Sequence, residues 1–103
     1  MNENFVDGRL LLDRTQEEKE PLIQRLRRIE GQVRGLQQMI EQDRYCLEEV
    51  QQINAILAAT KEVSIMLVSQ HMAAGLQRAI REDDTANAVE EIKAVLRAAL
   101  RQA

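Results

Sequence analysis

A stretch near the beginning of the chain decides the fold: LIQRLRRIEGQVRGLQQMI, residues 22–40. Its apolar side chains recur in alternating steps of four and three residues, at Leu22, Leu26, Ile29, Val33, Leu36 and Ile40. This heptad spacing predicts an amphipathic helix whose apolar stripe packs against another helix. Thr15 and Glu18 have the spacing of a capping box, and Pro21 also favours a first helical turn. We therefore expect the helix to begin between residues 16 and 21.

Two more helices are predicted, and short acidic turns separate them. Gln42-Asp43-Arg44 is typical of a turn, with Asp43 as the N-cap of a long helix over residues 44–81. The apolar residues of this helix cover more than one side, and the rest of the chain is too short to cover them all. Asp84 is expected to cap a third helix that ends near residue 101. The predicted fold is all-α, with three helices per chain, a long central helix and an oligomeric assembly.

Composition supports this fold and excludes several classes of protein. Ala, Glu, Leu, Arg and Lys make up about half of the 103 residues, which is typical of long helices. With no Trp, one Phe and one Tyr, folds that stack nucleic-acid bases on aromatic side chains are disfavoured. The single Cys cannot form a disulfide within the chain, and no apolar run approaches a membrane span, so we expect a cytoplasmic protein. Residues 1–15 are expected to form a flexible N-terminal arm, and residues 16–103 a three-helix domain.

Cys46 and His71 form the candidate binding site. They lie 25 residues apart on the predicted long helix, about seven turns, so both point the same way at a separation of roughly 37 Å. Two such helices packed antiparallel in a dimer would bring the thiol of one chain to the imidazole of the other, and a twofold dimer would contain two such sites. A thiolate, which the first turn of a helix favours, and an imidazole make a soft pair of donors for a metal. The alternative interpretation is a buried apolar cysteine and a hydrogen-bonded histidine.

Arginines gather in the first predicted helix, where residues 22–40 carry four of them against one glutamate. With one lysine of the second helix they are the candidate DNA contacts: Arg25, Arg27, Arg28, Arg34 and Lys61. Repeated in an oligomer, they would form a cationic surface suited to phosphates. The alternative is a solvated face with ion pairs such as Arg34 with Glu30. No phosphate loop or catalytic motif is present, so an enzyme with Cys46 as nucleophile is disfavoured.

The chain resembles the copper-sensitive operon repressor family, which also has nickel/cobalt-, formaldehyde- and persulfide-responsive branches. The resemblance runs from residue 22 to about 96, and its markers are RLRRIEGQVRGLQQMIEQDRYC (25–46), QQINAILAATKEV (51–63) and His71. It implies a disc-shaped tetramer, a dimer of dimers, that binds operator DNA and releases it with an inducer. It also implies that two basic residues contact the DNA, Arg25 and Lys61.

The resemblance implies further roles for single residues. Cys46 of one chain and His71 of another would hold the inducer between subunits. Tyr45 and Glu91 match the pair that couples the ligand histidine to the third helix. This coupling is physically reasonable, because a metal on one ring nitrogen leaves the other nitrogen as a donor to a carboxylate.

Gly75 departs from the pattern of copper-responsive members, which carry a second cysteine four residues after the histidine. The nickel/cobalt branch needs further histidines and the persulfide branch a second cysteine, and this chain has neither. Cu(I) can be held linearly by two ligands, so Cys46 and His71 can suffice. We therefore expect a repressor of transcription that senses copper. Formaldehyde or another thiol-reactive species is the alternative inducer, and a structural or adaptor oligomer is the alternative class.

Overall fold

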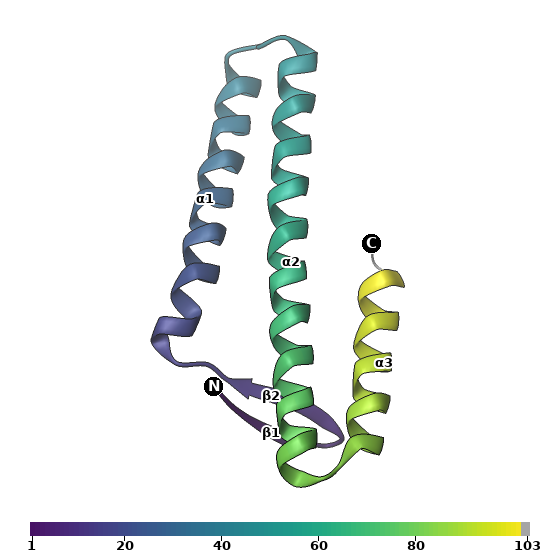
Figure 1. The fold of residues 1–103 in the computed structure, drawn as a ribbon. Coiled ribbons are helices and arrows are strands. Elements are labelled where there is room, and N and C mark those ends of the chain that lie inside the picture. Colours follow the sequence, from purple (N-terminus) through teal and green to yellow (C-terminus); the bar gives the residue numbers. More distant parts are fainter. Residues whose placement is uncertain (102–103) are drawn as a thin grey trace. The chain divides into compact units, whose positions relative to one another are not determined.

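The computed structural model describes residues 1–101, which form a hairpin of two strands followed by three helices (Figure 1). The strands are β1 (Asn2–Val6) and β2 (Arg9–Asp13). The helices are α1 (Gln16–Glu41), α2 (Cys46–Glu82) and α3 (Thr85–Arg101). The three helices and the long central one confirm the prediction, whereas the strands were not expected. The last two residues of the predicted domain, 102 and 103, lie outside the described residues.

The chain divides into two compact units. The helical unit, Lys19–Ile65, contains most of α1 and the first part of α2. The hairpin unit contains Met1–Glu18 and the chain from Met66 onward, and so includes the hairpin, the second part of α2 and α3. Each unit has its own set of candidate functional residues.

A capping box starts α1, as the sequence predicted. The N–H of Thr15 donates to Oε1 of Glu18 at 3.0 Å, and the N–H of Glu18 donates to Oγ1 of Thr15 at 3.2 Å. These two bonds satisfy backbone donors that have no partner inside the helix, so the helix begins at Gln16. The bond from the Thr15 N–H also holds the pKa of Glu18 below its ordinary value.

Asp43 ends α1 and does not cap α2, so this part of the prediction is wrong. Its backbone lies in the left-handed region, with φ of 53°. The N–H of Arg44 donates to the carbonyl of Met39 at 2.9 Å, and the N–H of Asp43 to that of Ile40 at 3.2 Å. This pair of bonds is a Schellman motif, in which Asp43 takes the position usually held by glycine.

Tyr45 is the residue that precedes α2. Its carbonyl accepts the N–H of Glu48 at 2.9 Å, the first bond of the helix. Cys46 is therefore the first residue of α2, and the helix begins two residues later than the expected start at residue 44.

The turn before α3 has the same design. Asp83 has a φ of 51°, and the N–H of Asp84 donates to the carbonyl of Ala79 at 3.0 Å. The Asp84 carboxylate accepts the side-chain amide of Asn87 at 2.9 Å and the guanidinium of Arg78 at 3.3 Å. The Asn87 bond first, and then Arg78, lower the pKa of Asp84. The predicted cap at Asp84 is confirmed.

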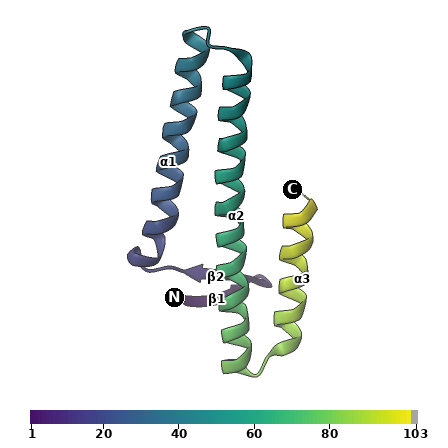
Figure 2. The same cartoon turned by 45° about the horizontal axis from the view of Figure 1, so that its top comes forward.

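Within the helical unit, α1 and α2 run side by side and antiparallel (Figures 1 and 2). The side-chain amide of Gln52 on α2 donates to the backbone carbonyl of Gln32 on α1 at 2.9 Å. A Cβ at Gly35 would stand 3.3 Å from that amide nitrogen, which is tighter than most real contacts. Gly35 therefore leaves room for a side chain to reach the backbone of α1.

Residues 2–13 form a β-hairpin where a flexible arm was expected. Asp7 and Gly8 occupy the turn with φ of 52° and 75°, and Val6 pairs with Arg9. Two consecutive residues at positive φ make a type I′ turn, whose twist matches that of the strands and which favours Asp-Gly. The division into an arm and a three-helix domain stays a prediction, but the arm has regular structure.

Few side chains of a single chain are buried. The buried apolar residues are Leu10, Leu22, Val63, Ala74, Ala79 and Ala88. Large apolar residues of α2 are exposed at many positions, among them Leu47, Val50, Ile53, Leu57, Ile65, Leu67, Leu76 and Ile80. No helix within residues 1–101 is long and apolar enough to cross a membrane.

Candidate functional site

His71 of α2 and Glu91 of α3 form a bonded pair in the hairpin unit. Nε2 of His71 lies 2.8 Å from Oε1 of Glu91, and the two side chains are only 19% and 12% exposed. A carboxylate accepts hydrogen bonds, so it favours the ring form that carries its proton on Nε2. The lone pair is then on Nδ1, which is the nitrogen able to bind a metal. The structure thus brings together the histidine and the glutamate that the family resemblance linked, while their coupling role stays a prediction.

The hairpin contacts the same carboxylate. The backbone N–H of Leu10 donates to Oε1 of Glu91 at 3.3 Å, so one oxygen accepts bonds from β2 and from the imidazole. The Leu10 side chain is 4% exposed, and its Cδ2 would lie 3.5 Å from a Cβ at Gly75. Leu10 was missed from the sequence because it is separated from Glu91 by 81 positions.

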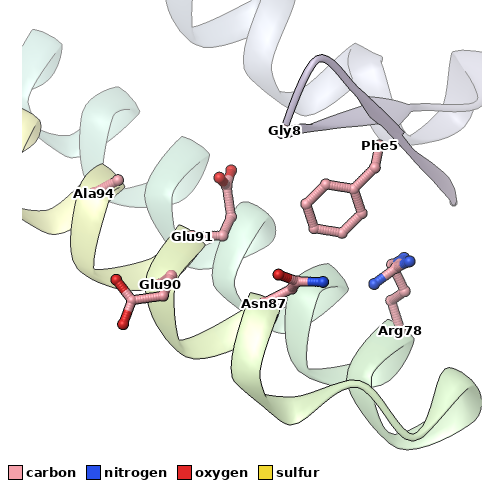
Figure 3. A pocket seen from close by; sticks show the side chains of 7 residues that line it. All are labelled: Phe5, Gly8, Arg78, Asn87, Glu90, Glu91 and Ala94. Atoms are coloured by element: carbon pink, nitrogen blue, oxygen red, sulfur yellow. The ribbon is translucent and has the colours of Figure 1, made fainter.

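Other contacts hold the hairpin on α2. The guanidinium of Arg78 lies 4.2 Å from the centre of the Phe5 ring (Figure 3). Arg81 is ion-paired with Glu3. Arg14, which follows β2, donates through Nε to the side chain of Gln70 at 2.8 Å. Gln70 directly precedes the ligand candidate on α2.

A pocket of about 430 Å³ opens between the hairpin and α3. Phe5 and Gly8 line it on one side, and Asn87, Glu90 and Glu91 on the other (Figure 3). The hairpin therefore does not pack tightly along α3, and it reaches the Glu91 carboxylate mainly through Leu10.

Cys46 and Tyr45 belong to the helical unit. Cys46 is a free, exposed thiol at the start of α2, and Tyr45 is 68% exposed. Thiol and imidazole suit a soft ion such as Cu(I). Among residues 1–101, however, no group of three or more His, Cys, Asp or Glu side chains is placed to hold a metal. The pairing of Cys46 with His71 and the coupling role of Tyr45 therefore stay predictions.

The five candidate DNA contacts, all in the helical unit, are exposed. Arg27 pairs with Glu20 at 3.8 Å, and both side chains are well solvated, so this pair contributes little. The alternative pair of Arg34 with Glu30 is not formed in the described part of the chain. Among residues 1–101 the other four candidates form no ion pair, and they are exposed to an anionic partner: Arg25, Arg28, Arg34 and Lys61.

Known proteins are similar to this chain in sequence and in fold. Residues 18–98 match the metal-sensitive transcriptional repressor family. The copper-sensing transcriptional repressor CsoR of Bacillus subtilis (strain 168) is 39% identical over 90 residues, which are 87% of this chain and 89% of that protein. The crystal structure of the copper-sensing repressor CsoR with Cu(I) from Geobacillus thermodenitrificans NG80-2 has a TM-score of 0.76 and 40% identity, over 89% of this chain and 96% of that one.

The nickel-responsive transcriptional regulator InrS also has a TM-score of 0.76, with 31% identity over 85% of this chain and 99% of its own. The match over residues 18–98 spans most of α1, all of α2 and most of α3. It confirms the resemblance inferred from the sequence. It also confirms that the protein is a regulator and not an enzyme. The chain belongs to the family of metal-sensitive transcriptional repressors.

Proposed function

We propose that this protein represses transcription by binding operator DNA, and that Cu(I) is its inducer at a site made by Cys46 of one chain and His71 of another. The observation that carries this proposal is the 2.8 Å bond between His71 Nε2 and Glu91, which leaves Nδ1 as the donor nitrogen. The exposed thiol of Cys46 is the second donor. Cu(I) is a soft ion that a thiolate and an imidazole can hold linearly.

Copper is favoured over nickel by the donors that the chain carries. Its only histidine is His71, whereas nickel sites rely on nitrogen and oxygen donors. The copper-sensing repressors among its relatives, one of them described with Cu(I), support the same choice.

An oligomer is needed to complete the site. We propose antiparallel dimers that pair into a disc-shaped dimer of dimers in the cytoplasm. The exposed apolar side chains of α2 support this assembly, because a stable monomer seldom leaves so many on one helix. Each dimer would join two thiols with two imidazoles across its twofold axis.

Release of DNA would follow from a two-state tetramer. The exposed cations of α1 and Lys61 bind phosphates in one state, and the inducer stabilises the other. Glu91 links the imidazole to α3, so that the position of this helix can depend on the ligand. A coupling of about 1–3 kcal/mol is typical of such systems.

DNA binding by the protein to its own promoter fragment, with anaerobic addition of Cu(I), tests the proposal. We expect an affinity that falls steeply with salt and with Arg25→Ala. Arg44→Ala is the matched control, because Arg44 is exposed and already paired with Glu48 at 3.0 Å. Cys46→Ala should bind DNA like the wild type and no longer release it with Cu(I). Release of this variant by Cu(I) would contradict the site.

Formaldehyde is a second candidate inducer. It is favoured by the exposed Cys46 thiol and by Gly75, which supplies no third soft donor. Titration of the same complex with formaldehyde distinguishes the two, since release by formaldehyde alone would replace copper as the inducer. A protein that binds no promoter DNA would instead be an adaptor oligomer.

A further inference from the structure

We infer that the β1–β2 hairpin positions the inducer site, and that the backbone N–H of Leu10 is the group that fixes the Glu91 carboxylate on His71. The inference rests on the proposed function of His71 as a ligand. It adds that residues 2–13, which lie outside the matched family region of residues 18–98, take part in sensing.

The geometry of the hairpin presents this N–H to α3. Hydrogen-bonded and outward-facing pairs alternate along an antiparallel ladder, and β2 is an edge strand in a two-stranded sheet. Leu10 is paired in register with Phe5. Its backbone N–H points away from β1, and it therefore can donate to Glu91. The N–H of Leu12 has the same orientation two residues later.

Two donors then hold one carboxylate oxygen. Oε1 of Glu91 accepts the His71 Nε2–H at 2.8 Å and the Leu10 N–H at 3.3 Å. A carboxylate whose Oε1 accepts both bonds cannot rotate away from the ring without losing the Leu10 bond as well. The ring is thereby kept with Nδ1 as the donor nitrogen, the form that the proposed site requires.

The hairpin is attached at a few points, so its docking can change. Leu10 is the buried apolar residue of the hairpin, while Val6 and Leu11 are exposed. The other attachments are the cation–π contact of Arg78 with Phe5, the Arg81–Glu3 ion pair and the Arg14–Gln70 bond just after β2. The pocket of about 430 Å³ is lined by Phe5 and Arg78. Loss of the Leu10 bond would therefore loosen the carboxylate without unfolding the helices.

The experiment uses the only histidine of the chain as a probe. Nitrogen-15 spectra of the His71 ring report which nitrogen carries the proton, in the full-length protein without metal. Leu10→Pro removes the outward N–H, Leu10→Ala keeps it and removes the side chain, and Leu12→Pro is the matched control, because proline is tolerated where an edge N–H faces outward. Cu(I) affinity is measured on each variant by competition with a chelator.

We expect Leu10→Pro to move the ring signals of His71 toward a mixture of the two tautomers. It should also weaken Cu(I) binding by about tenfold, as loss of the hydrogen bonds that orient a metal ligand typically does. Leu12→Pro should leave both unchanged, and Leu10→Ala should leave the ring signals unchanged. In a Glu91→Gln background, Leu10→Pro should cost much less Cu(I) affinity than in the wild type, because the two act through one bond.

Three results would overturn the inference. The ring signals of His71 could stay unchanged in Leu10→Pro, or they could change as much in Leu12→Pro. The third is a loss of Cu(I) affinity from Leu10→Pro that is as large in the Glu91→Gln background as in the wild type. If Leu10→Pro does not fold, hydrogen exchange of the Leu10 amide decides, since it should be faster in Glu91→Gln than in the wild type. If the wild type binds no Cu(I), the proposed function fails, while the ring spectra still decide whether the hairpin positions the pair.

Discussion

The side chain of Leu10 lies over Gly75, where the Cβ of any larger residue would meet its Cδ2 at 3.5 Å. This is an ordinary contact, so position 75 can accept a Cβ without displacing the hairpin. Gly75→Cys would supply the second cysteine that the family resemblance leads us to expect four residues after His71. We expect it to raise Cu(I) affinity, because it adds a third donor, and a second thiolate suits this soft ion.

Competition with a Cu(I) chelator measures this effect under anaerobic conditions. Gly75→Ala is the control, since it adds the Cβ without the sulfur. Equal affinities of the alanine and cysteine variants would show that position 75 does not face the site.

Thr15→Ala should destabilise the protein by about 1 kcal/mol, because it removes the acceptor of the Glu18 N–H at the start of α1. Thr15→Ser keeps the hydroxyl and should retain most of the stability. Urea unfolding followed by circular dichroism gives both values. A serine variant as unstable as the alanine variant would argue against the capping bond.

Asp43→Val should cost roughly 1–2 kcal/mol, because a β-branched residue resists the left-handed backbone that Asp43 adopts. Asp43→Gly should be tolerated, since glycine is the usual residue at this position of a Schellman motif. Thermal unfolding of the two variants tests the assignment. Similar melting temperatures for valine and glycine would contradict it.

Asp84 should make the free energy of unfolding depend on pH in the acidic range. Its pKa is lowered in the folded state by Asn87 and Arg78 from an ordinary value of 3.8. The contribution of the Asp84 charge to the free energy of unfolding is therefore complete above pH 3.8. It is lost as the pH falls from there through the pKa of Asp84 in the folded state. Asp84→Asn keeps a good N-cap and removes the charge.

Urea midpoints of wild type and Asp84→Asn should differ at pH 7, with the wild type more stable, and the difference should narrow as the pH falls below 3.8. A difference that does not narrow below pH 3.8 would show that the charge of Asp84 is not its cause.

Local sequence signals predicted most of the helices. The heptad seam, the Thr15–Glu18 box and the Asp84 cap each depend on residues close in the chain, and all three are observed as helix features. Asp43 was misassigned because aspartate is frequent both as an N-cap and, more rarely, in the left-handed position after a helix. The distinction depends on which carbonyls the following N–H groups reach, and sequence does not show this.

The hairpin had a signal that was overlooked. Asp7-Gly8 between short runs that contain apolar residues is a strong indication of a two-residue β-turn. The contact of the hairpin with Glu91 had no sequence signal, because it is made by the backbone N–H of Leu10, a group that every residue except proline has. The pairing of His71 with Glu91 came from family resemblance, since no local pattern connects side chains on two helices.

The Leu10–Glu91 bond joins positions 81 residues apart, and the Glu3–Arg81 pair joins positions 78 apart. A ribosome completes the hairpin long before it makes the helix that receives it. Closing so large a loop is slow compared with forming a helix, because chain entropy is lost before the contact is made. The segment synthesised first is thus expected to find its place last, and a nascent chain that stops short of α3 would lack the Glu91 carboxylate that accepts the Leu10 N–H.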